Sequence, residues 1–166
     1  MKSIFLKSLL IIGIFFMYNC RAQSFSIDDY IAFYNGGVPK LNTVALNKTQ
    51  FYGQNFSEFY NELLSKNVSV VDLSYASKTD TGTKYHMLAL YFCDSNMDKP
   101  ALDNKFQIPV IWITFENEIP PQIKNMVLQY HGEWNSTFVQ FFSDMKIEKI
   151  EFGGINGYNS NDWSGK

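Results

Sequence analysis

The stretch FQIPVIWITFE, residues 106–116, is the most apolar predicted strand of the chain and decides the fold. Alternation gives this strand two apolar faces, one made by Ile111, Ile113 and Phe115 and the other by Val110 and Trp112. Because a strand that is apolar on both faces is covered on both sides, we expect it to lie in the interior of a sheet. Pro109 has no amide hydrogen, so it should lie at the start of the strand or at a bulge.

Three further strands are predicted on either side of this one in the sequence. Within residues 68–76, Leu73 and Tyr75 alternate with polar neighbours, which is typical of a strand. A polar loop over residues 77–84 leads to a returning strand over residues 84–93, so we expect this pair to form an antiparallel hairpin. Residues 146–152 have the pattern of a last strand.

Four helices are predicted from apolar positions spaced three and four residues apart. Ser26 and Asp29 predict the start of the first helix, because the side chain of each can bind the backbone amide of the other. Glycine commonly ends a helix and proline commonly begins one. The predicted limits are Ser26 to Asn35-Gly36-Gly37, Asn55 to about Lys66, Pro120-Pro121 to Gly132, and about Asn135 to Met145.

These elements follow the order α-α-β-β-β-α-α-β. We predict an α+β fold, a single domain over residues 24–152, with an about four-stranded mixed, mostly antiparallel sheet and four helices packed mainly on one face. The link from the third to the fourth strand passes through two helices, which permits parallel pairing. Loops are expected at residues 38–54 and 94–105. The Gly-, Asn- and Ser-rich residues 153–166 predict a flexible C-terminal tail.

Residues 1–22 have the pattern of an export signal. Lys2 and Lys7 form a basic start, and about ten apolar residues follow Lys7. A helix that spans a bilayer needs roughly 20 apolar residues, so this run has the length of a secretory signal instead. We expect an exported chain that lies in the periplasm or is lipid-anchored in the cell envelope, rather than one secreted into the medium.

Two processing routes are open at the end of this signal. Cleavage after Ala22 by signal peptidase would remove Cys20 together with the leader. Alternatively, Met17-Tyr18-Asn19-Cys20 resembles the lipobox of bacterial lipoprotein signals, and this resemblance implies lipidation of Cys20 and a membrane anchor. Either route leaves Cys93 without a cysteine partner in the globular domain, so no disulfide is expected there.

Charge disfavours two classes of partner. The chain has 14 basic and 16 acidic residues, and loss of Lys2, Lys7 and Arg21 with the leader leaves 11 basic residues and a net charge of −5. Lysine and arginine form no cluster, whereas nucleic acids and anionic membranes attract such clusters. We therefore expect no nucleic-acid partner, and membrane contact only through a lipid on Cys20.

The segment YHGEW, residues 130–134, supplies the candidate ligand-binding residues His131, Glu133 and Trp134. Between two helices, they could form the rim of a pocket in which His131 acts as an acid or base. The same residues also fit a structural role, because a histidine near a helix C-terminus meets the negative end of the helix dipole and Gly132 can make the turn. The sequence favours the structural role and leaves the other open.

No catalytic residue and no metal ligand is predicted. Cys93 and His86 lie on one predicted strand, but seven strand residues span about 23 Å and odd and even positions point to opposite faces. We therefore expect Cys93 to be a buried structural thiol. Two histidines and one thiol do not occur at the spacing of metal sites, and no cofactor motif is present, so neither metal nor cofactor is expected.

The sequence therefore favours a non-catalytic protein over an enzyme. Our leading prediction is an exported, non-catalytic envelope protein that binds a partner protein or small ligand, and a toxin-neutralising, immunity-like role fits its size and acidity. One alternative is a small periplasmic hydrolase with a pocket near His131. Another is a carbohydrate- or surface-binding module, which exposure of Trp134 or Trp163 would favour.

Overall fold

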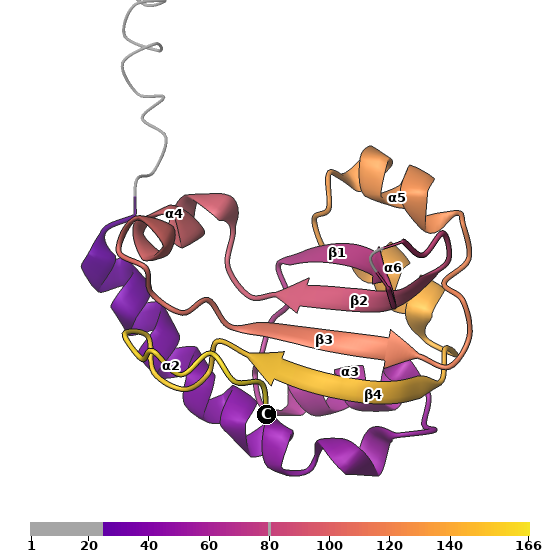
Figure 1. The fold of residues 1–166 in the computed structure, drawn as a ribbon, viewed down its shortest axis with the longest axis horizontal. Helices are drawn as coiled ribbons and strands as arrows, with labels where there is room; N and C mark the ends of the chain where they lie inside the picture. Colours follow the sequence, from indigo (N-terminus) through magenta and orange to yellow (C-terminus); the bar gives the residue numbers. More distant parts are fainter. Residues whose placement is uncertain (1–24, 80) are drawn as a thin grey trace, which may run out of the picture.

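The computed structural model describes residues 25–79 and 81–166 as one α+β domain, which confirms the predicted fold class and the order of the predicted elements (Figure 1). In chain order the elements are α2 (Ile27–Leu46), η1 (Lys48–Phe51), α3 (Phe56–Ser65), β1 (Asp72–Ser77), β2 (Tyr85–Tyr91), α4 (Ser95–Asp103), β3 (Val110–Phe115), α5 (Ile123–Tyr130), α6 (Ser136–Phe142) and β4 (Ile147–Gly153). The predicted export signal, with Cys20, lies outside the described residues. Within them, no helix has both the length and the hydropathy that crossing a bilayer requires.

The four strands form one sheet in the order β1-β2-β3-β4, so β3 is interior, as the apolar stretch predicted. All three neighbouring pairs are antiparallel, and the parallel contact that a mixed sheet would need is not formed among the described strands. After β3 the chain passes through α5, which lies beside β1, and α6 then leads it back to the end of the sheet where β3 stops (Figure 1). The chain therefore returns beside the strand it left, and the Glu116 amide donates to the Lys146 carbonyl at 3.0 Å.

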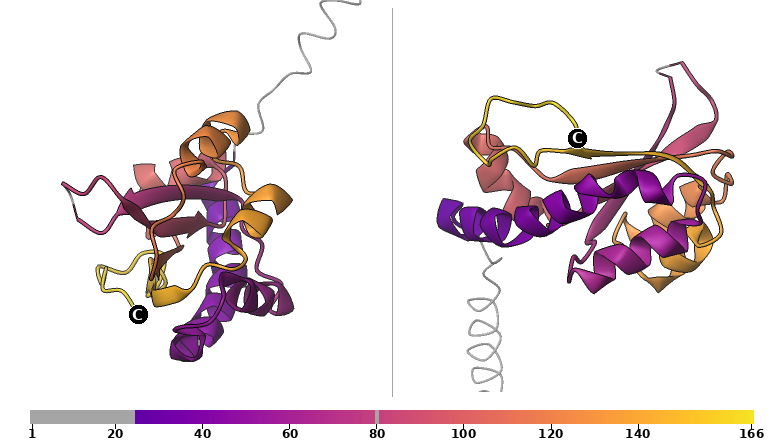
Figure 2. Two further views of the ribbon diagram at one scale, coloured as in Figure 1. Left: turned by 90° about the vertical axis from the view of Figure 1, so that its right-hand side faces the viewer. Right: turned by 90° about the horizontal axis from the view of Figure 1, so that it is seen from below.

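Helices α2 and α3 lie on one side of the sheet, and the C-terminal segment lies on the other (Figure 2). The strand side chains that face the helices are fully or almost fully buried: Leu73, Leu88, Leu90, Ile111, Ile113, Phe115, Ile150 and Phe152. Large rings fill the space below them, as the high aromatic content of the chain requires. Phe115 and Phe142 stack with centroids 5.6 Å apart and an interplanar angle of 8°. We call this side of the sheet the inner face and the opposite side the outer face.

Helix α2 continues through Gly36, Gly37 and Pro39 to Leu46, although the sequence predicted that it ends at the glycines. Its start is as predicted, because the capping box of Ser26 and Asp29 is formed. Beyond the glycines, the apolar stripe continues with Val38, Leu41 and Val44, all buried against the rest of the domain. Burying one such side chain contributes about 1.5–3 kcal/mol, so together they offset the helix-breaking residues.

Helix α4 lies where the sequence predicted only a polar loop, residues 94–105. Asp94 caps it, since its side chain accepts from the backbone amides of Asn96 and Met97. Among its residues only Ala101 is fully buried, so the helix has almost no apolar periodicity to reveal it. The helix packs against α2, and its contribution to the fold is to form one end of the outer face.

The segment after β4, which we expected to be a flexible tail, is instead hydrogen-bonded to the domain. The fully buried Gln107 donates from Nε2 to the carbonyls of Ser160 and Asp162, at 2.9 and 2.6 Å. The Tyr34 hydroxyl donates to the Gly154 carbonyl at 2.9 Å. The sequence did not reveal these contacts because backbone carbonyls make most of them, and every residue has a backbone carbonyl. The Gly-, Asn- and Ser-rich composition therefore suggested a flexible tail.

Candidate functional site

The predicted residues His131, Glu133 and Trp134 lie in the turn after α5, where they extend the edge of the sheet. His131 is exposed and ends α5 in the left-handed conformation, with φ at 55°. The Leu73 amide then donates to the Gly132 carbonyl, and the Trp134 amide donates to the Val71 carbonyl, both at 2.9 Å. This turn therefore covers the outer edge of β1 at its start.

The side chains of these three residues do not converge. The Trp134 indole is half-buried, lies at 9° to the ring plane of Phe142 and donates from Nε1 to the Tyr60 hydroxyl at 3.1 Å. His131 and Glu133 are exposed to solvent on the same turn. None of the three lines the cavity between α2 and the loop before β1 or the cavity between the sheet, α4 and the C-terminal segment.

Cys93 is a buried thiol just beyond the end of β2. It donates to Oδ1 of Asp98 at 2.8 Å, and burial raises the pKa of the thiol well above its usual range. A thiol in this state holds its proton, whereas a cysteine nucleophile must lose it.

His86, on β2, has a buried Nδ1 atom with no hydrogen-bond partner among the described residues. Within the same residues, no three His, Cys, Asp or Glu side chains form a group that could hold a metal ion.

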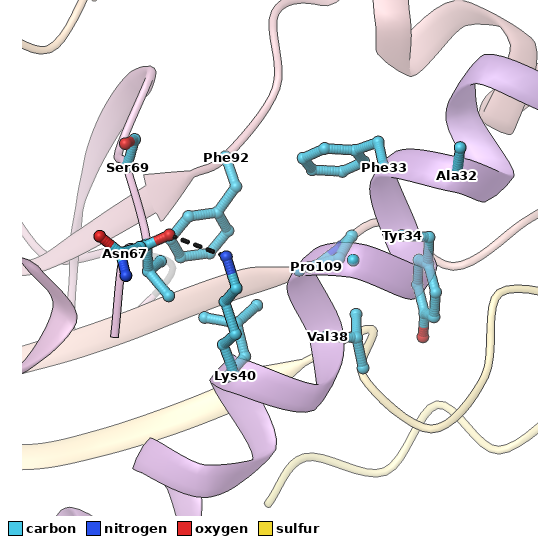
Figure 3. Close-up of a pocket in the computed structure, with 13 residues that line it drawn as sticks. Ala32, Phe33, Tyr34, Val38, Lys40, Asn67, Ser69, Phe92 and Pro109 are labelled. Atoms are coloured by element: carbon cyan, nitrogen blue, oxygen red, sulfur yellow. Dashed lines mark hydrogen bonds between the residues drawn. The ribbon is translucent and has the colours of Figure 1, made fainter. Parts of the chain in front are cut away.

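The first cavity lies between α2 and the loop before β1, and we call it the α2 cleft (Figure 3). Its volume is about 320 Å³, within the roughly 300–1,000 Å³ of small-molecule pockets. Phe33 from α2 and Phe92 from the chain after β2 supply two aromatic rings. Gly36 and Gly37 form part of the helix wall of the cleft.

The two glycines open this cleft because nothing occupies the space of their missing side chains. A Cβ atom built on either residue finds no heavy atom within 4 Å outside the helix itself. Each glycine in a helix interior costs about 1 kcal/mol relative to alanine. Since neither residue has a positive φ or a close neighbour that excludes a side chain, packing within the described chain gives no reason for glycine at these positions.

Among the described residues that line the α2 cleft, Lys40 is the only charged one. Its ammonium group donates to the Asn67 carbonyl at 3.2 Å, as the dashed line in Figure 3 shows. Asn67 has a positive φ of 53° at the turn that ends α3, and Ser69 follows it on the cleft wall. The cleft therefore combines aromatic walls with one positive charge and the polar side chains of Tyr34, Asn67 and Ser69.

Comparison with protein-family models, with curated proteins and with solved structures gave no match to this chain.

Replacing Gly36 or Gly37 with alanine should raise the free energy of unfolding by about 0.5–1 kcal/mol each, because alanine fits the space and favours the helix. Gly153→Ala should have the opposite effect, a loss of about 1–3 kcal/mol, because its Cβ would lie 2.3 Å from Cζ3 of Trp112. Urea unfolding of the three variants measures both effects. A destabilising Gly36→Ala would show that the glycines serve packing within the domain.

Proposed function

We propose that this chain is an exported, non-catalytic binding protein of the cell envelope, and that its α2 cleft takes a small ligand. The observation that carries the proposal is the pair of glycines in the middle of α2. They weaken a long helix, a Cβ added to either would meet no atom beyond it, and they form part of the wall of a cavity. Residues that disfavour the secondary structure they lie in, and that packing does not explain, are expected at ligand-binding sites.

The lining of the α2 cleft suits a ligand with an apolar body and one anionic group. Phe33 and Phe92 offer ring surface to the body. Lys40 offers the ammonium group, and no Asp or Glu is among the lining residues in the described ranges 25–79 and 81–166. Medium-chain carboxylates have this chemistry, so we assign them as the ligand class.

Envelope location follows from the leader rather than from the folded domain. A basic start and a short apolar run direct export, and a lipid on Cys20 would tether the binding domain to a membrane.

The two alternative functions have less support. His131 is exposed and, among the described residues, lines neither the α2 cleft nor the cavity between the sheet, α4 and the C-terminal segment, so neither cavity supports the hydrolase. Trp163 is 60% exposed, which fits a surface-binding module better than the half-buried Trp134 does.

Isothermal titration with octanoate, octan-1-ol and octylammonium tests the ligand class, because the three probes share one chain and differ in charge. Octanoate should bind most tightly. Lys40→Gln should weaken octanoate binding about tenfold and leave octan-1-ol unchanged, since one charge-assisted contact contributes about 1–2 kcal/mol. Gly37→Leu should abolish binding of all probes by filling the cleft. Lys84→Gln, on an exposed lysine outside the cleft, is the control.

Equal affinity for the three probes would contradict an anionic ligand. No binding of any probe would contradict the proposal that the α2 cleft is a binding site.

The lipid anchor is tested by growing a bacterial host that makes the full chain with a fatty-acid analogue. The parent chain should become labelled and the Cys20→Ala variant should not, because Cys20 is the acceptor. If the parent stays unlabelled and its mature form begins at Gln23, the anchor is wrong and export by signal peptidase remains. A cytosolic chain that keeps Met1 would contradict export itself.

A further inference from the structure

A second cavity, of about 380 Å³, lies on the outer face of the sheet, and we call it the outer-face cleft. It lies between the sheet, α4 and the C-terminal segment. Trp112 and Tyr91 contribute aromatic side chains from the strands, and Gly153 is among its lining residues on β4. The Trp112 indole occupies the position that a side chain on residue 153 would need, which explains the glycine there.

Two large apolar side chains at this cleft remain in contact with water. Trp163 is 60% exposed and Leu102, at the end of α4, is 65% exposed. The backbone next to Trp163 is held because the preceding residue, Asp162, accepts at its carbonyl from Gln107, deep in the domain. A ligand in the cleft would meet the Trp163 indole and the aromatic side chains of the strands.

Within the part of the chain that the structure describes, Asp98 is the only charged residue that lines the outer-face cleft. Burial raises its pKa, and the nearby carboxylates of Asp94 and Asp72 raise it further, while the hydrogen bond from Cys93 acts in the opposite direction. Among residues 25–79 and 81–166, no lysine or histidine nitrogen lies within 4.0 Å of the Asp98 carboxylate. This carboxylate is thus partly removed from water without a counter-charge from the described chain.

We propose that the outer-face cleft is a second binding site, specific for a small organic cation whose ammonium group lies between the aromatic rings and the Asp98 carboxylate. Aromatic faces attract alkylammonium groups, and a carboxylate strengthens that attraction. The charged residue that the structure places on the wall of the α2 cleft is Lys40, so the two clefts differ in the sign of the charge they select. The inference is independent of the carboxylate proposed for the α2 cleft.

A neutral sugar fits the outer-face cleft less well. Aromatic rings do stack on sugars, but a sugar also needs partners for several hydroxyl groups. Apart from Asp98 and the hydroxyl of Tyr91, which is paired with Ser74 Oγ at 3.2 Å, the side chains that line the cleft are apolar or carry only an indole N–H. We therefore make sugar binding an outcome of the test rather than the proposal.

Choline and 3,3-dimethylbutan-1-ol provide the test, because they have nearly the same shape and differ in charge. The ¹⁵N-labelled full chain has three tryptophans, so it gives three indole N–H signals. Choline should shift the signals of Trp112 and Trp163 in a saturable way. Trp134, whose indole donates to Tyr60 in the core, should not shift and serves as the internal reference. The neutral alcohol should bind about tenfold more weakly than choline.

Asp98→Asn keeps the shape of the side chain and removes its charge. It should weaken choline binding about tenfold and leave the alcohol unchanged, which also shows that the cleft is intact. Asp103→Asn, on an exposed carboxylate of the same helix paired with Lys99, should change neither affinity.

Three results would overturn the proposal: equal affinity of the parent protein for choline and the alcohol, no saturable shift with choline, or tighter binding of methyl glucoside than of choline. If Asp98→Asn lost affinity for both probes, the parent protein would decide the outcome. Binding of choline about tenfold tighter than the alcohol would support the proposal, and equal affinity would contradict it. None of these results bears on octanoate binding at Lys40.

Discussion

The buried amide of Gln107 is the interaction on which the arrangement of this domain depends. Its side chain is completely buried immediately before β3, and it donates to Ser160 and Asp162 and accepts from the Asn156 amide. Its backbone carbonyl accepts from the Tyr30 hydroxyl of α2. One residue thus joins the long helix on the inner face to the C-terminal segment on the outer face. A buried amide left without these partners would cost about 1–3 kcal/mol, so the contacts specify one path for the segment.

This connection matters because helices α2 and α3 cover only the inner face of the sheet. The outer face carries Trp112, and the C-terminal segment is what approaches it. Neither the helices on the inner face nor the C-terminal segment on the outer face covers the sheet completely. The glycines of α2 leave one cleft beside Lys40, and the outer face leaves another beside Asp98. Both proposed ligand sites are these two clefts. The opposite charges of Lys40 and Asp98 distinguish the ligands that the clefts would bind.

Much of the fold was predictable, because it depends on patterns that a few neighbouring residues contain. The alternation around Trp112 placed β3 inside the sheet, and α6 begins after Asn135 as predicted, where the Thr137 amide donates to the Asn135 side chain. The prediction failed where distant packing overrides a local signal. Gly36 and Gly37 suggested a helix end, yet the buried stripe that follows them keeps the helix intact. The continued spacing of apolar residues after Pro39 was the signal that could have revealed this.

The candidate sites were not predictable from the sequence, because their residues meet only in the folded chain. Lys40 and Asn67 come from different elements, as do Asp98 and Trp163. The sequence predicted His131 at the end of a helix, as α5 confirms, but residue type alone did not show that the residue lies outside both clefts. The free energy of unfolding of Gln107→Leu, measured in urea beside the exposed control Gln140→Leu, tests the central role of Gln107 most directly. The account predicts that Gln107→Leu loses about 1–3 kcal/mol while the control changes by less than about 0.5 kcal/mol. Equal stability of the two variants would contradict it.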